Sequence, residues 1–151
     1  MSKNPTYHFA IVGTGAAGLH VALAMQAHPF FADKTILLID KSAKECNDRT
    51  WCFWEKTEGK WDEIITKKWT KGLFASTQKT LDLNLAPYTY KMLRSADFYA
   101  HAKAILQNAP NFTWRTAEVL EVTENESVEI KTAEETFFAA QVFDSRINKN
   151  H

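Results

Sequence analysis

Three glycines near the N-terminus have the spacing of a phosphate-binding turn. Gly13, Gly15 and Gly18 follow an apolar run in the pattern G-x-G-x-x-G. Gly13 permits a tight turn, Gly15 has no Cβ and lets the backbone approach a ligand, and Gly18 lets a following helix pack closely on a sheet. Phosphates would bind the free N–H groups at the helix N-terminus. The expected pyrophosphate-binding residues are Gly13, Thr14, Gly15, Ala16, Ala17 and Gly18.

An acidic residue follows at the distance expected of a ribose-binding group. Thr35–Ile39 is a second apolar run, and Asp40 ends it about twenty residues beyond Gly18. A carboxylate there can accept hydrogen bonds from both ribose hydroxyls of an adenosine. The combination predicts an adenine dinucleotide site, and these residues fit NAD as well as FAD. The alternative is a glycine-rich turn without a ligand.

The elements that position these residues form a β-α-β unit. The pattern predicts a buried parallel strand at Tyr7–Val12, a helix at about Ala16–Ala27 and a strand that ends at Asp40. A signal peptide or membrane segment is a rival interpretation, because residues 7–32 contain no Asp, Glu, Lys or Arg. The glycines and Gln26 interrupt this stretch and favour the buried unit.

Further elements follow along the chain. An amphipathic helix is predicted at Trp61–Trp69, ended by Gly72, and a second helix at Ser95–Gln107, with Ser95 as N-cap and Asp97 in its first turn. From Glu118 the sequence consists of short segments of alternating hydrophobicity, which indicate a β-meander. The predicted strands are Leu81–Leu85, Phe112–Thr116 (the third parallel strand), Val119–Thr123, Val128–Thr132, Thr136–Phe138 and Gln141–Ser145.

Composition limits the class of protein. The 151 residues match one domain, and 18 basic against 18 acidic residues give no electrostatic reason to expect nucleic acid as a partner. Cys46 and Cys52 have no zinc-ligand spacing around them, so we expect no metal site and reduced thiols in a cytoplasmic protein. The sequence leaves the oligomeric state open.

An aromatic segment follows the dinucleotide motif. Thr50–Glu55 alternates Trp51 and Phe53 with Cys52 and Trp54, and it either fills apolar space or forms a wall against a flavin or an apolar substrate. Arg49 precedes it. A guanidinium at this place can reach a pyrophosphate or a flavin, and a solvated surface arginine is the alternative.

Several runs together resemble one enzyme family. The order of elements is similar to the FAD-binding half of the FAD-dependent hydroxylase and isoprenoid-cyclase group. More narrowly, the chain resembles bacterial lycopene β-cyclase from Tyr7 to Arg146. The runs that carry this resemblance are Asn47–Trp54, Tyr90–Arg94, Asp97–Tyr99 and Val142–Arg146.

The resemblance implies a fold and a domain organisation. It implies an α/β fold, namely a Rossmann-like FAD-binding domain of the glutathione-reductase and hydroxylase type, with a parallel sheet and a β-meander over residues 1–151. Members of the family are more than twice this long, and their acidic catalytic motif lies beyond the position of Arg146. We therefore expect the N-terminal part of a longer enzyme, with the substrate domain largely absent and the catalytic residues unknown. A truncation, a disrupted gene and a natural short form would give the same sequence.

The resemblance also implies an activity. The linear ends of lycopene would close to β-ionone rings with reduced FAD, without net redox change and with NAD(P)H as reductant. The protein would work at the cytoplasmic face, with peripheral membrane contact. The glycines and Asp40 would hold the ADP half of FAD. Arg49 would approach the flavin, the Val119 backbone would meet adenine, and Ser145 would lie near the phosphates.

Two other functions remain open from the sequence. One is an FAD-dependent monooxygenase or a geranylgeranyl-reductase-like oxidoreductase, because their first halves share this order of elements. The other is a nucleotide-binding module without catalysis of its own, which the short length favours.

Overall fold

The structure, a computed structural model, describes residues 6–147, which belong to two compact units. Unit 1 takes its residues from Met1–Glu45 and Ala102–His151, and unit 2 is Cys46–His101. Helix α2 (Ser95–Leu106) contributes residues to both units.

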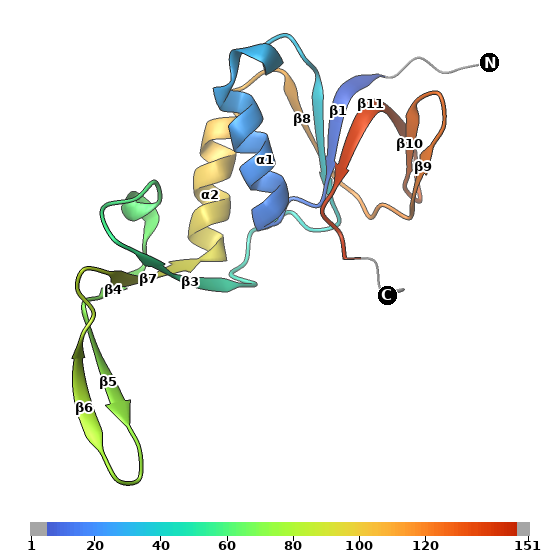
Figure 1. The fold of residues 1–151 in the computed structure, drawn as a ribbon. Helices are drawn as coiled ribbons and strands as arrows, with labels where there is room; N and C mark the ends of the chain where they lie inside the picture. Colours follow the sequence, from blue (N-terminus) through green and yellow to red (C-terminus); the bar gives the residue numbers. More distant parts are fainter. Residues whose placement is uncertain (1–5, 148–151) are drawn as a thin grey trace. The chain divides into compact units, whose positions relative to one another are not determined.

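Unit 1 is built on a six-stranded sheet in the order β8-β2-β1-β11-β10-β9 (Figure 1). The first four strands in this order are parallel, and β10 and β9 continue the sheet antiparallel. The central β1 pairs on both sides, since Ala10 lies opposite Leu37 of β2 and Val142 of β11. The strands are β1 (Tyr7–Val12), β2 (Ile36–Asp40), β8 (Phe112–Thr116), β9 (Glu121–Glu124), β10 (Val128–Lys131) and β11 (Thr136–Asp144).

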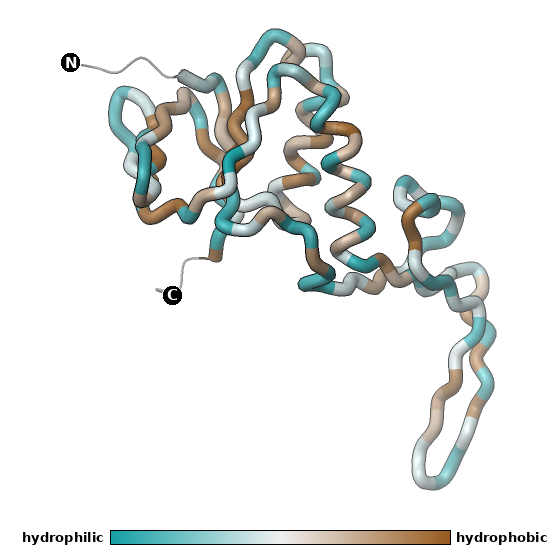
Figure 2. The backbone as a smooth tube through the Cα atoms, turned by 180° about the vertical axis from the view of Figure 1, so that it is seen from behind, coloured by the Kyte–Doolittle hydropathy of each residue, from teal (hydrophilic) through white to brown (hydrophobic). Residues whose placement is uncertain are grey.

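The strands at the centre are hydrophobic on both faces because both faces are buried. Four consecutive side chains of β2, Ile36–Ile39, are fully buried, as expected of a parallel strand with both faces covered. The hydropathy colouring shows such apolar segments in brown (Figure 2). On one face, β1 and β2 pack with the meander in a core of Ala10, Val12, Leu37, Ile39, Val119, Ile130, Phe137 and Ala139.

Helix α1 (Ala16–Ala27) follows β1 directly, as predicted. It buries one side through Leu19, Ala22, Leu23 and Met25. The helix ends at Ala27. The next residue, His28, has an extended backbone because it precedes Pro29, and proline disfavours a helical residue before it. The short 3₁₀ helix η1 (Pro29–Phe31) then leads toward β2.

The end of the sheet differs from the prediction in one respect. The expected separate strands at Thr136–Phe138 and Gln141–Ser145 are one strand, β11. Its first half pairs antiparallel with β10 and its second half pairs parallel with β1. Ala139 has both partners, Val128 and Tyr7. The predicted strands left out Ala139 and Ala140, but β11 continues through both residues.

Unit 2 holds the other two sheets and a second 3₁₀ helix. A three-stranded antiparallel sheet has the order β3-β7-β4, and β5 and β6 form a separate hairpin. The elements are β3 (Thr50–Glu55), η2 (Asp62–Ile64), β4 (Lys67–Trp69), β5 (Lys71–Ala75), β6 (Thr80–Asn84) and β7 (Thr89–Arg94).

The helix predicted at Trp61–Trp69 is wrong. This segment forms η2 and then β4, where Lys67 and Trp69 pair with Met92 and Tyr90 of β7. Ile65 and Thr66, which follow η2, are β-branched and favour extended backbone, and the pairing of β4 with β7 decides the outcome. Gly72, expected to end that helix, lies inside β5.

The aromatic segment mainly packs within unit 2. The Trp51 ring contacts the rings of Phe98 and Tyr99 with centroid separations of 5.7 and 6.2 Å. The Trp54 ring lies tilted against the Tyr90 ring with centroids 4.7 Å apart, but Trp54 stays more than half exposed. Between residues 6 and 147, no helix is long and apolar enough to cross a membrane.

Candidate functional site

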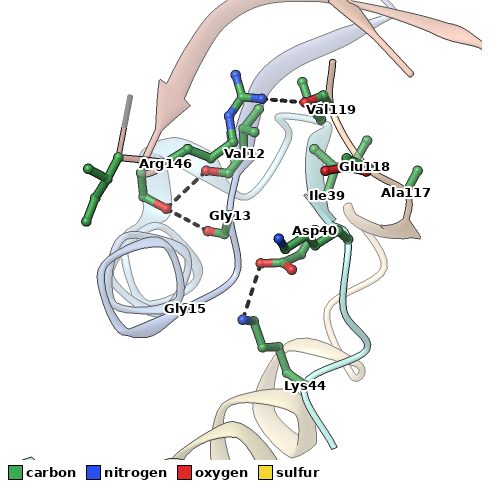
Figure 3. Close-up of a pocket in the computed structure, with 13 residues that line it drawn as sticks. Val12, Gly13, Gly15, Ile39, Asp40, Lys44, Ala117, Glu118, Val119 and Arg146 are labelled. Carbon is green, nitrogen blue, oxygen red and sulfur yellow. Dashed lines mark hydrogen bonds and ion pairs between the residues drawn. The ribbon is translucent and has the colours of Figure 1, made fainter. Parts of the chain in front are cut away.

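A cavity of about 390 Å³ lies where the parallel strands of unit 1 end. Val12 ends β1, Asp40 ends β2 and Ala117 follows β8, and all three line the cavity (Figure 3). Ser145, which follows β11, lines it as well. Ligands of open α/β sheets bind at this edge, outside the carboxyl ends of the strands. The remaining lining residues are Gly13, Gly15, Ile39, Lys41, Lys44, Glu118, Val119, Arg146 and Ile147.

The glycine turn has the geometry that the sequence predicts. Gly13 has a φ of +91°, which an L-residue with a side chain rarely adopts. A Cβ on Gly18 would lie 1.9 Å from the Gly13 carbonyl oxygen and 3.1 Å from Cγ2 of Ile11, so only glycine lets α1 lie this close to β1. A Cβ on Gly15 would meet nothing within 4 Å. Gly15 therefore faces open space in the cavity wall.

The N-terminus of α1 presents backbone donors. The hydrogen bond from Leu19 N–H to the Gly15 carbonyl closes the first turn, so the N–H groups of Ala16, Ala17 and Gly18 precede the intrahelical ladder. No side chain caps this helix end and its first turn holds no acidic residue. The arrangement suits an anionic ligand, because both the free donors and the helix dipole favour negative charge.

Asp40 links the glycine turn to the loop after β2. Its Oδ2 accepts a 2.7 Å hydrogen bond from Thr14 N–H, and its Oδ1 accepts a 2.9 Å hydrogen bond from Ser42 N–H. Lys44 Nζ lies 3.7 Å from Oδ2 (Figure 3). A carboxylate has about four lone-pair positions, so Asp40 retains acceptor capacity toward the cavity.

Ser145 joins the end of β11 to the glycine turn. Its Oγ lies 3.0 Å from the carbonyl oxygens of both Val12 and Gly13, and its N–H donates to Val12 at 2.9 Å. The single hydroxyl hydrogen is directed at these carbonyls. Ser145 thus lines the cavity, and its hydrogen bonds fix the shape of the turn.

Arg146 closes the cavity on the side of the meander. Its guanidinium forms a two-pronged pair with the Asp144 carboxylate. Its Nη1 donates to the Val119 carbonyl (Figure 3). The hydrogen bonds with Asp144 raise the pKa of Arg146. Burial of Asp144 acts to raise its pKa, but the hydrogen bonds from Arg146 outweigh burial and the pKa is lowered. Both groups are therefore charged at neutral pH.

The cavity gathers half of the ten predicted cofactor-binding residues: Gly13, Gly15, Asp40, Val119 and Ser145. Thr14, Ala16, Ala17 and Gly18 lie in the adjoining turn and helix start. Arg49 belongs to unit 2, where Ser95 holds its backbone: Arg49 N–H donates to Ser95 Oγ and the Arg49 carbonyl accepts from Ser95 N–H.

Three basic residues of the cavity were not predicted: Lys41, Lys44 and Arg146. Each directly follows or lies close to a predicted site residue, since Lys41 and Lys44 come after Asp40 and Arg146 comes after Ser145. Their positions just beyond the ends of predicted strands could have indicated that they line the site.

The residues present fit the ADP half of a dinucleotide. The glycine turn leaves an open wall at Gly15, the helix start offers backbone donors, and Asp40 stands at the ribose position. The cavity volume also falls in the range of about 300–1,000 Å³ that small-molecule sites occupy.

Solved structures show where this fold occurs. The chain is similar to the halogenase PltM in complex with phloroglucinol and FAD, with a TM-score of 0.68 and 12% identity, over 95% of this chain and 35% of that one. It is also similar to p-nitrophenol 4-monooxygenase PnpA from Pseudomonas putida DLL-E4, with a TM-score of 0.71 and 14% identity, over 94% and 41% of the two chains. The fold is thus the predicted Rossmann-like FAD-domain fold, and the chain spans well under half the length of these proteins.

Sequence comparison gives the family. No curated protein matches the chain. The sequence model described as "Lycopene cyclase protein" matches residues 8–150. Because this match covers nearly all of the sequence, the chain belongs to the lycopene cyclase family.

Proposed function

We propose that this chain is the FAD-binding portion of a lycopene β-cyclase. The observation that carries the proposal is the convergence of the glycine turn, Asp40 and the ends of four parallel strands on one cavity, in a chain of the lycopene cyclase family. Membership of the family supports the proposed reaction, and the cavity supports the proposed position of the ADP half of FAD.

The residues of unit 1 divide the work of holding that half. The N–H groups at the start of α1 would bind the pyrophosphate, and Gly15 would let it come within reach of them. Asp40 would accept the ribose hydroxyls. The Val119 segment, held by Arg146, would form the wall beside adenine.

The proposed reaction closes the linear ends of lycopene to β-ionone rings without net redox change. Reduced FAD, with NAD(P)H as the electron source, would supply an electron-rich surface that stabilises developing positive charge. The catalytic acid remains unassigned. We propose that it lies in a substrate portion of a longer protein, since the structurally similar enzymes extend well beyond the matched region.

Lycopene is apolar and dissolves in membranes, so the proposal includes peripheral contact with a bilayer at its cytoplasmic face. The β5–β6 hairpin supports this part of the proposal. Phe74 and Leu81 lie directly opposite each other, and with Leu83 they stay exposed on one face of the hairpin. Exposed apolar groups of this kind mark interaction surfaces.

FAD titration is the first test. Purified protein should quench the fluorescence of added FAD at one site per chain, and ADP should compete with FAD because it occupies the same half of the site. Gly15→Ala should weaken both ligands. Absence of binding by FAD and by ADP would overturn the proposal.

Turnover separates the cyclase from its alternatives. The longer product of the same gene, with reduced FAD and lycopene in vesicles, should yield cyclic carotenoid without net consumption of NAD(P)H per ring. Oxygen-dependent NAD(P)H oxidation or alkene reduction would instead identify a monooxygenase or a reductase. Tight FAD binding with no turnover even in the longer product would identify a binding module.

A further inference from the structure

Lys44 is held beside Asp40 by the local structure of the loop. Its backbone has a φ of +54°, a left-handed conformation that is uncommon for a residue with a side chain. Its N–H donates to Ser42 Oγ at 3.1 Å, and Ser42 N–H in turn donates to Asp40. Lys103 Nζ donates to the Ala43 carbonyl and anchors the same loop. The loop therefore fixes where the Lys44 side chain starts.

The Lys44 ammonium and the Asp40 carboxylate are largely withdrawn from solvent. The two side chains are only 16% and 11% exposed, and both line the cavity. Nζ and Oδ2 are 3.7 Å apart, which exceeds a normal N–H···O hydrogen bond. An ion pair near the surface stabilises a fold little, so the pair alone does not account for a strained lysine backbone.

The gap between the two groups suits a hydroxyl. A hydroxyl is both a donor and an acceptor, so one ribose hydroxyl can donate to Asp40 and accept from Lys44 at the same time. Two partners about 2.8 Å from one tetrahedral oxygen are about 4.5 Å apart, so the Lys44 ammonium, now 3.7 Å from Oδ2, can share a hydroxyl with Asp40 after a shift of less than about 1 Å. A carboxylate alone can only accept, so it leaves the hydroxyl lone pairs to water.

We infer that Lys44 is a ribose-recognition residue that acts together with Asp40 on the diol of the adenosine. The inference rests on the proposed nucleotide site, and it adds to that site a cation which satisfies the acceptor side of the ribose hydroxyls. Lys44 thereby makes the site selective for nucleotides with an intact 2′,3′-diol.

The test measures how strongly the protein prefers ADP over 2′,3′-dideoxy-ADP. The wild type should bind ADP about tenfold or more tightly than the dideoxy analogue, since hydrogen bonds to charged groups are lost. Lys44→Met should reduce this preference several-fold, and Lys44→Arg should restore most of it. Isothermal titration calorimetry measures the affinity of the wild type and of each variant for ADP and for 2′,3′-dideoxy-ADP. Circular dichroism checks that the variants are folded.

Lys41→Met is the matched control. Lys41 also lines the cavity, so this change removes the same charge and should weaken both ligands by the same factor. An unchanged preference in Lys44→Met, or a wild type that does not distinguish the two ligands, would overturn the inference while leaving FAD binding in place. A wild type that binds neither FAD nor ADP would overturn the proposed function instead.

Discussion

Gly15 and Gly18 lack a side chain for different physical reasons. Gly18 is needed by the fold, because its Cβ position is occupied by the Gly13 carbonyl oxygen. Gly15 is needed by the proposed ligand, because its Cβ position is open and faces the cavity. Alanine substitutions at these two positions, three residues apart, should therefore have different effects. One should lower the stability of the fold and the other should weaken ligand binding.

Gly18→Ala should destabilise unit 1 by about 3 kcal/mol or more, since a backbone oxygen cannot move aside as a flexible side chain does. Gly15→Ala should leave the melting temperature within a few degrees of the wild type and weaken FAD about tenfold or more, because the methyl group occupies space that the pyrophosphate requires. Thermal unfolding and FAD titration of both variants check this. A stable Gly18→Ala protein would show that the close approach of α1 to β1 is not required.

The glycines and Asp40 could be predicted from the sequence because their tasks are local. A turn, a helix start and a strand end are all specified within short segments. The contact of Arg146 with Val119 joins residues far apart in the chain, and the placement of Lys44 depends on one unusual backbone angle, so neither follows from spacing. Arg49 follows β2 in the sequence but belongs to unit 2, and it is not among the residues that line the cavity of unit 1.

At the level of elements, β7 contains Lys91, a buried lysine of unit 2. The Lys91 side chain is 2% exposed, and Nζ donates to Glu55 at 2.6 Å and to Asp62 at 2.5 Å. Burial acts to lower the pKa of Lys91, but the bonds to Asp62 and Glu55 raise it above its usual value. The hydrogen bonds from Lys68 and Lys91 lower the pKa of Asp62 to about 2. These contacts join β3, η2 and β7.

The stability of unit 2 should consequently fall in acid. Because the pKa of Asp62 is lower in the folded chain than its ordinary value of 3.8, its contribution is fully present above about pH 4 and is lost as pH falls toward 2. Asp62→Asn should lower the melting temperature at pH 5, and the difference from the wild type should shrink toward pH 2. Tryptophan fluorescence reports the transition, and the exposed Glu134→Gln serves as control. A difference that stays constant with pH would contradict this assignment.

Secondary structure followed from the sequence where local pattern and tertiary pairing agree. The apolar run of β1, the extent of α2 and the strand at β8 are examples, although Ser95, predicted as the N-cap, is the first residue of α2. The helix prediction for Trp61–Trp69 was wrong because the same apolar spacing also fits one short turn followed by a strand. Pairing with β7 favours the strand. Strand β5 was not predicted for the same reason, because its pairing with β6 forms the hairpin and its own sequence pattern does not specify it.

At the scale of the whole molecule, the exposed hairpin should govern contact with lipid. Phe74→Ser combined with Leu81→Ser should reduce co-sedimentation with phosphatidylcholine vesicles at least about tenfold, because two apolar side chains no longer enter the bilayer. FAD affinity should not change, since the cavity is formed by residues of unit 1. The exposed Leu120→Ser is the matched control. Equal sedimentation of the hairpin variant and the wild type would exclude the hairpin as the lipid contact.

The place of β11 in the sheet affects how the protein is made. β11 lies between β1 and β10, and Tyr7 of β1 pairs with Ala139. During synthesis, β1 leaves the ribosome long before this partner exists, on the order of ten seconds at ordinary elongation rates. Until then, one edge of a very apolar strand is unpaired in the nascent chain. We therefore expect this polypeptide to depend on chaperones during translation more than a protein whose neighbouring strands follow one another in sequence.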